Sequence, residues 1–290
     1  MTEQSFPKVK PQKAGVMASM MKARATKPGE IYGVPGQGDT RLLSVASILG
    51  IIFVWWLVTY MGWAKPLFLP SPGAVLGKFF DVWNKGFTNT SFLDHVGVSA
   101  ARVFGAFLLA CIIGIPLGLS MGMSPIMRGI FDPPIEFYRP IPPLAYLPLM
   151  IIWFGIGETS KVLLIFLSVL APVALGARSG VKSAAIEQIH AAYSFGASRW
   201  QVMLQVILPS ALPEILTAMR IGIGFGWTTL VAAEMVAATK GLGYMVLTAS
   251  QFLQTSTVIM GIIVIAIIAY AFDLLMRFVE RKLVPWKGRM

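Results

Sequence analysis

The chain has 290 residues, of which 56% are apolar and 13% are charged, and its mean hydropathy is +0.72. Soluble globular domains carry about 25% charged residues, so this composition excludes an ordinary soluble domain and indicates a membrane protein. The net charge of +11 would suit a nucleic-acid partner, but basic loops on one side of a membrane would produce it equally well.

The N-terminal segment, residues 1–41, is rich in Lys, Pro and Gly and has few large apolar side chains. This predicts a mobile basic tail on the cytoplasmic side. The first apolar segment starts only at Leu42 and has full spanning length, which favours a retained helix over a cleaved secretory signal. Residues 42–97 are therefore predicted to hold the first transmembrane helix and an outer segment.

Six apolar segments approach the length of about 20 residues that crosses about 30 Å of hydrocarbon. They are residues 42–61, 101–123, 144–156, 162–177, 215–238 and 258–276. Prolines interrupt the third and fourth, which predicts broken or tilted helices that pack against protein or line a cavity. An all-α membrane protein with about six transmembrane helices is expected.

The basic residues follow the positive-inside rule when both termini are placed in the cytoplasm. Most of them then fall in inside segments, and the outside segments hold only Lys65, Lys78, Lys85, Lys161 and Lys240. The basic surplus thus reflects topology, and no nucleic-acid partner is expected. The sole cysteine, Cys111, lies in an apolar span, so neither an intrachain disulfide nor a cysteine metal site is possible.

Two cytoplasmic segments separate these spans. The first, residues 124–143, is predicted to be a helix with Arg128, Asp132, Glu136 and Arg139 along one side. The second, residues 178–212, has good helix formers, a break at 194–198, and apolar residues at helical spacing up to Pro209. It is predicted to be a helix–turn–helix on the membrane surface, either a simple interfacial connector or a docking element for a cytoplasmic partner.

Ionisable groups in the spans cost about 2.5–3.5 kcal/mol each at mid-membrane unless they are paired or snorkel. Arg220 is expected to snorkel to the inner surface, Asp273 to pair with Arg277, and Arg102 to reach the outer headgroups.

Glu234 lies near the outer end of the fifth span. Its carboxylate could line a translocation cavity, contact an outside partner or simply sit at the interface. With Trp227 it is the candidate for the translocation path.

Catalytic motifs are absent from the sequence. No G-x-x-x-x-G-K-[ST] loop is present, so this chain is not expected to hydrolyse nucleotides. The two histidines, His95 and His190, form no H-E-x-x-H pair, and no base stands near a candidate nucleophile. We expect a transport subunit with no catalytic residue, metal site or bound cofactor.

The inside segment 178–212 resembles the loop of ABC-type import permeases, which reads Glu-Ala-Ala, three residues, Gly, nine residues, Ile, one residue, Leu-Pro. The matching positions, together with two turn residues, are His190, Ala191, Ala192, Gly196, Ala197, Ser198, Val206, Leu208 and Pro209. His190 replaces the acidic residue and Val206 replaces Ile. The resemblance implies that this loop docks into a cytoplasmic ATPase, with Ala192 to Ser198 in contact and Gly196 at the turn.

Further segments are similar to the nitrate, sulfonate and taurine branch of these importers. They are YRPIPPLAYLPL at 138–149, WFGIGETSK at 153–161, LVAAE at 230–234 and AATKGLG at 237–243. The resemblance implies the type I importer fold, with a permease core over 98–277 and a basic cytoplasmic tail over 278–290.

The same resemblance implies the cargo and the partners. The cargo would be taurine or a related sulfonate, crossing the bacterial inner membrane. The partners would be two ATPase subunits that carry ATP and Mg, an external substrate-binding protein, a second copy of the chain and membrane lipid.

Two alternatives remain open. The same machinery could carry an aliphatic sulfonate, nitrate or a small heterocycle, because a separate binding protein largely sets specificity in such systems. A secondary transporter or channel acting alone is the other, although it would favour paired intramembrane charges or a repeated half.

Overall fold

The structure, a computed structural model, describes residues 41–285, and the regular elements in this range are helices. They are α2 (Arg41–Tyr60), α3 (Pro72–Lys85), α4 (Phe92–Met123), α5 (Pro125–Tyr138), α6 (Pro143–Phe154), α7 (Glu158–Val181), α8 (Ile186–Ser194), α9 (Arg199–Val202), the π-helix η1 (Met203–Ile207), α10 (Leu208–Ala237), α11 (Leu242–Gln251) and α12 (Thr255–Leu283). The predicted all-α fold is confirmed. The predicted tail over 1–41 lies outside the described residues except for Arg41, and so does 286–290 of the predicted tail over 278–290.

The chain divides into two units, residues 1–66 and residues 67–290. In the first unit, α2 is apolar on all sides and matches the predicted first span almost residue for residue. In the second unit, the described helices long and apolar enough to cross a membrane are α4, α7, the continuous helix Arg199–Ala237 and α12. Together these account for five of the six predicted spans.

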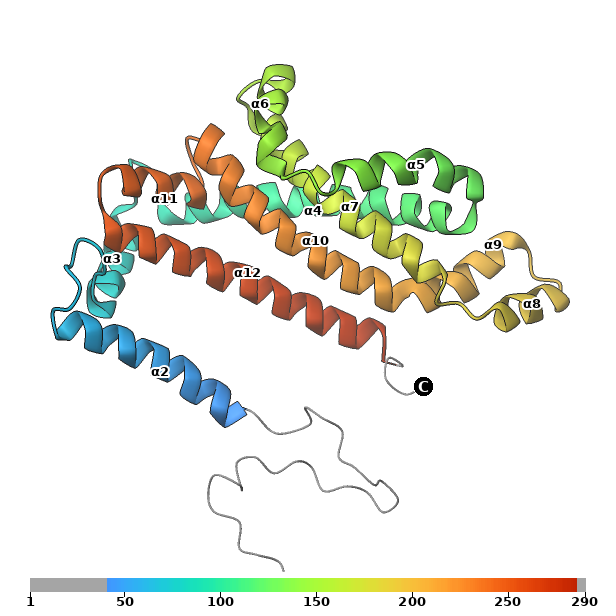
Figure 1. Cartoon of the computed structure of the whole chain (residues 1–290), viewed down its shortest axis with the longest axis horizontal. Coiled ribbons are helices and arrows are strands. Elements are labelled where there is room, and N and C mark those ends of the chain that lie inside the picture. Colours follow the sequence, from blue (N-terminus) through green and yellow to red (C-terminus); the bar gives the residue numbers. More distant parts are fainter. Residues whose placement is uncertain (1–40, 286–290) are drawn as a thin grey trace, which may run out of the picture. The chain divides into compact units, whose positions relative to one another are not determined.

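The core of the second unit is α4 and α10 packed on either side of α7 (Figure 1). Buried side chains from all three helices and from α12 form one cluster, which includes Phe107, Ile165, Ile223 and Phe272. Small residues allow the backbones to approach closely. A Cβ on Gly118 of α4 would lie 2.2 Å from the carbonyl oxygen of Ala174 on α7, so only glycine fits this contact.

Helices α5 and α6 together run antiparallel to α7. The contacts of α5 move along α7 from its carboxyl end to its middle: Asp132 pairs with Arg178, Ile135 packs on Ala174, and the Tyr138 hydroxyl donates to the Leu167 carbonyl at 3.3 Å. Helix α6 continues toward the amino end of α7, where Leu147 and Met150 pack with Leu164.

The helix predicted within residues 124–143 is present as α5. Asp132 and Glu136 of this helix pair with Arg178 of α7, whereas Arg128 and Arg139 are exposed. The predicted third span, residues 144–156, corresponds to α6, an apolar helix of 12 residues. The helical structure is interrupted between α5 and α6, at residues 139–142, close to the middle of α7.

Candidate functional site

The predicted helix–turn–helix is present as α8, a turn and α9 (Figure 1). Gly196 has φ +81, a left-handed conformation that favours glycine, so the sequence places glycine where the chain must turn. Ser198 caps α9 with a capping box: its hydroxyl accepts from the Gln201 backbone N–H, and its own N–H donates to the Gln201 side chain at 2.8 Å. The turn is therefore a defined structure.

Most of this segment contributes little to the packing of its own chain. Phe195 at the turn is 92% exposed, and Tyr193 and Trp200 are also exposed. His190, Ala191, Gly196 and Ser198 are exposed, whereas Ala192 and Ala197 are half-buried. An exposed aromatic on a rigid turn is typical of a surface that a partner covers.

The helix after the turn does not end at Pro209 or Pro213, contrary to the prediction. Residues Arg199–Ala237 form one continuous helix, which contains the π-helical turn Met203–Ile207 just before Leu208 and Pro209. Val206, Leu208 and Pro209 thus lie within a helix that joins the exposed turn to α10.

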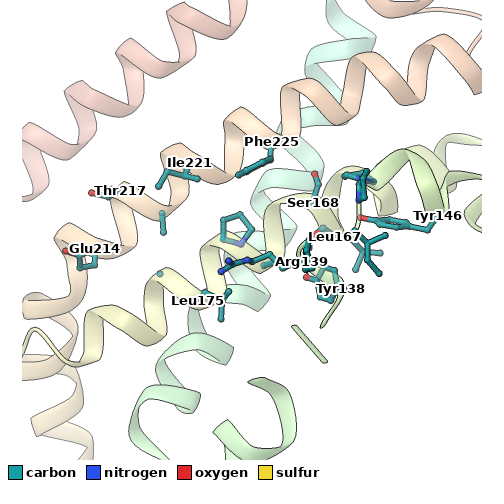
Figure 2. A pocket seen from close by; sticks show the side chains of 18 residues that line it. Tyr138, Arg139, Tyr146, Leu167, Ser168, Leu175, Glu214, Thr217, Ile221 and Phe225 are labelled. Carbon is teal, nitrogen blue, oxygen red and sulfur yellow. Dashed lines mark hydrogen bonds between the residues drawn. The ribbon is translucent and has the colours of Figure 1, made fainter. Parts of the chain in front are cut away.

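A cavity of about 530 Å³ opens beside the break between α5 and α6. Its walls come from this break, the middle of α7 and the first half of α10 (Figure 2). Most of the wall is apolar, with hydroxyls from Tyr138, Tyr146, Ser168 and Thr217. Arg139 and Glu214 are the charged residues that line it.

The cavity itself was not predicted from the sequence, although the break beside it was. The prolines at 140–143 indicated a broken helix, and broken helices at membrane depth were expected either to pack against protein or to line a cavity. Arg139 was instead counted among the cytoplasmic basic residues.

Glu234 and Trp227, the predicted path residues, do not line this cavity. Glu234 is fully buried and its carboxylate is engaged: it accepts from the Ser99 hydroxyl at 2.7 Å, from Arg102 Nη1 at 2.7 Å and from the Gly243 N–H at 2.8 Å. Trp227 is 6% exposed and packs in the core cluster, where its Nε1 has no hydrogen-bond partner among the described residues.

The sequence predicted that Arg102 reaches the outer headgroups, and this prediction is wrong. It is 5% exposed and connects three elements: it donates to both Glu158 oxygens of α7 at 2.6 and 2.7 Å, to Glu234 of α10, and to the Lys240 carbonyl before α11. Lys161 pairs with the same Glu158 at 2.9 Å. This outer charge cluster ties α4, α7, α10 and the start of α11 together.

A second set of ion pairs joins α10 and α12 toward the opposite end. Arg220 contacts Asp273 at 3.2 Å and Glu280 at 3.1 Å, so it is paired within the protein and does not simply snorkel. The predicted pair between Asp273 and Arg277 is confirmed at 2.7 Å. Within residues 41–285, no group of three or more His, Cys, Asp and Glu side chains could hold a metal ion.

Residues 114–285 match the family model described as binding-protein-dependent transport system inner membrane component. The chain belongs to this family. It is 53% identical over 249 residues to the taurine transport system permease protein TauC of Escherichia coli K12, a match that covers 86% of this chain and 90% of that protein. The permease is therefore a multi-pass transport subunit of a bacterial inner membrane and not an enzyme.

The names of other relatives mention different cargoes. The permease is 34% identical to SsuC of Bacillus subtilis, to which aliphatic sulfonates transport is assigned, over 82% of this chain and 85% of that protein. It is 29% identical to the bicarbonate transport system permease protein CmpB of Synechococcus elongatus, over 84% and 89%. A chain of the methionine ABC transporter MetNI, in an inward-facing conformation, shares the fold with a TM-score of 0.58 at 18% identity, over 66% of this permease and 95% of that chain.

Proposed function

We propose that the permease moves taurine or a closely related sulfonate inward, after a separate binding protein delivers it. The identity of 53% to a taurine permease over most of both chains carries this proposal, and the relative assigned to aliphatic sulfonates supports the same cargo class. A permease of this family implies an ATPase and a substrate-binding protein as partners. ATP and Mg would be bound by the ATPase, and a second copy of the chain would complete the passage.

The exposed turn after α8 is the proposed ATPase-docking surface, which includes His190, Ala191, Ala192 and residues 195–198. Its support is physical: Phe195 is almost fully exposed, the turn is held by a capping box, and one unbroken helix connects it to α10. Closure of an ATPase dimer against this turn would move α10 directly, and α10 forms one wall of the cavity.

The docking proposal is tested with Phe195→Ala in the assembled transporter. Phe195 packs against little in its own chain, so the variant should fold normally yet retain at least tenfold less ATPase in a pull-down from mild detergent. Phe252→Ala is the matched control, because Phe252 is also an exposed phenylalanine directly after a helix. Full ATPase recovery with Phe195→Ala would contradict the docking surface.

The cargo is tested by uptake into proteoliposomes that contain the permease, its ATPase and the binding protein. Taurine should be transported in an ATP-dependent manner and should compete with other small sulfonates. Transport of nitrate or bicarbonate without taurine would replace the cargo but keep the machine. A chain that conducts solute without any ATPase would overturn the importer assignment.

Glu234 and Trp227 stay hypotheses for the path. In the described conformation, Glu234 would have to release Ser99, Arg102 and the Gly243 N–H before it could take a cargo ammonium group. Unchanged cargo dependence with Glu234→Gln would remove this residue from the path.

A further inference from the structure

Arg139 differs from the other basic side chains that line or join the packed helices. Arg102, Lys161, Arg178 and Arg220 each form an ion pair with a carboxylate of a neighbouring residue. Arg139 forms no ion pair and no side-chain hydrogen bond within residues 41–285, and its side chain is exposed to the cavity it lines. The protein therefore keeps one guanidinium available in this wall.

The position of Arg139 beside the middle of α7 makes this availability costly. It directly follows Tyr138, whose hydroxyl reaches Leu167 near the middle of α7, so the guanidinium is attached far from either end of that span. A cation without a partner is unfavourable at such depth unless water or an anion reaches it. Arginine is also the side chain best suited to bind a planar or tetrahedral oxyanion through several N–H groups.

The break between α5 and α6 holds Arg139 in place. It caps the end of α5, and the prolines that follow prevent the helix from continuing through the wall. The amino end of α6 begins at Pro143 in the same wall, and the partial positive charge of a helix amino end favours an anion nearby. The positively charged Arg139 guanidinium and the partial positive charge at the amino end of α6 thus both face one mostly apolar cavity.

A carboxylate provides the opposite sign in the same cavity. Glu214 of α10 is exposed and has no ion-pair partner within the described residues. Figure 2 shows Glu214 at one end of the labelled lining and Arg139 nearer its middle, so the two charges lie along the cavity. A solute with one acidic and one basic group would meet each in turn, and a volume of about 530 Å³ holds a solute of that size with room for water.

We propose that this cavity is a cargo subsite of the permease, that Arg139 binds the anionic group of the cargo, and that Glu214 faces its cationic group on the way to the inner end. The ligand class is a small sulfonate or comparable monoanion, with or without an ammonium group. This assignment rests on the proposed import of taurine or a related sulfonate, and it names the residue that recognises that anion within the membrane.

The first measurement is taurine uptake by the reconstituted transporter. Arg139→Gln should lower the initial rate at least tenfold, whereas Arg139→Lys should recover part of it because the charge remains. Arg128→Gln is the matched control, since Arg128 is exposed on the same helix and lies outside the cavity. An uptake rate of wild-type size with Arg139→Gln would overturn the subsite.

The second measurement reads the electrostatic field of the cavity without transport. Ser168 lines the cavity and Cys111 is the sole native cysteine, so Cys111→Ala with Ser168→Cys leaves one thiol in the wall. Its labelling rates are compared for 2-sulfonatoethyl methanethiosulfonate and the cationic 2-(trimethylammonium)ethyl analogue. Arg139→Gln should lower the ratio of anionic to cationic labelling at least fivefold, and millimolar taurine should slow both only while Arg139 is present.

The two measurements separate the subsite from the proposed function. If the wild-type complex moves no sulfonate but the labelling ratio falls with Arg139→Gln, the cargo assignment fails and the anion subsite stands. If taurine uptake is normal and neither uptake nor the labelling ratio responds to Arg139→Gln, the subsite is wrong and the import of taurine stands.

Discussion

Arg102 and Glu234 form a buried ion pair, with 2.7 Å between Nη1 and Oε1, although 132 residues separate them in the sequence. The two side chains are 5% and 0% exposed. This pair, with Glu158 as a second acceptor, holds the outer end of α10 against α4 and α7.

Removal of one partner should be far more damaging than removal of both. Arg102→Met leaves the Glu234 carboxylate buried without a cation, which costs about 3–5 kcal/mol. The double variant Arg102→Met, Glu234→Gln should recover part of this loss, because no buried charge remains in the pair. Thermal unfolding in nanodiscs measures both, and strictly additive effects would show that the pair does not act as a unit.

Gly241 should tolerate no side chain. Its φ is +131, and a Cβ would lie 2.4 Å from the carboxylate carbon of Glu234. Gly241→Ala should therefore destabilise the protein by about 1–3 kcal/mol from backbone strain alone, and more if Glu234 is displaced. Gly155→Ala is the control, since Gly155 also has a positive φ of +77 but nothing lies within 4 Å; equal unfolding temperatures for the two variants would refute the contact.

The α4–α7 contact at Gly118 should fail on substitution. Gly118→Val would place a branched side chain where the Ala174 carbonyl already lies at 2.2 Å from the Cβ position. We expect little monodisperse protein after size-exclusion chromatography. Gly105→Val, on the same helix where a Cβ meets nothing within 4 Å, should purify as wild type does.

The capping box of α9 should matter locally and not globally. Ser198→Ala removes the acceptor of the Gln201 N–H and should cost about 1 kcal/mol. Hydrogen exchange at residues 199–202 should speed up roughly fivefold while exchange in α7 stays unchanged. Faster exchange throughout the bundle would mean that the turn supports the whole fold.

Local patterns were enough to predict the long spans and the helix–turn–helix. The apolar segments predict helices that cross the membrane, and the break at residues 194–198 predicts a turn of the backbone. Gly196, with φ +81, confirms the turn. Both signals lie within a few residues of the feature they specify.

Contacts between distant residues could not be predicted in the same way. Nothing near Arg102 in the sequence indicates Glu234, so the headgroup prediction was wrong. The contact of Tyr138 with Leu167, which places α5 along α7, joins residues 29 positions apart. The π-turn before Pro209 could not be predicted either, because no residue type indicates it. For the same reason, the cavity that Arg139 lines was not predicted.

The helix Arg199–Ala237 has 39 residues and, at 1.5 Å per residue, is about 58 Å long. One end carries the exposed turn, the first half of α10 forms a cavity wall, and Glu234 lies near the other end. A tilt of about 5° around its midpoint displaces each end by about 2.5 Å in opposite directions, by the same rise per residue. If the helix tilts as a rigid body, a force on the turn moves the cavity wall and Glu234 at the same time. The same tilt would then change the shape of the cavity and strain the hydrogen bonds of Glu234. The π-turn at Met203–Ile207 lies between the exposed turn and the cavity wall, so a bend there would decide how much of a push on the turn reaches the rest of the helix.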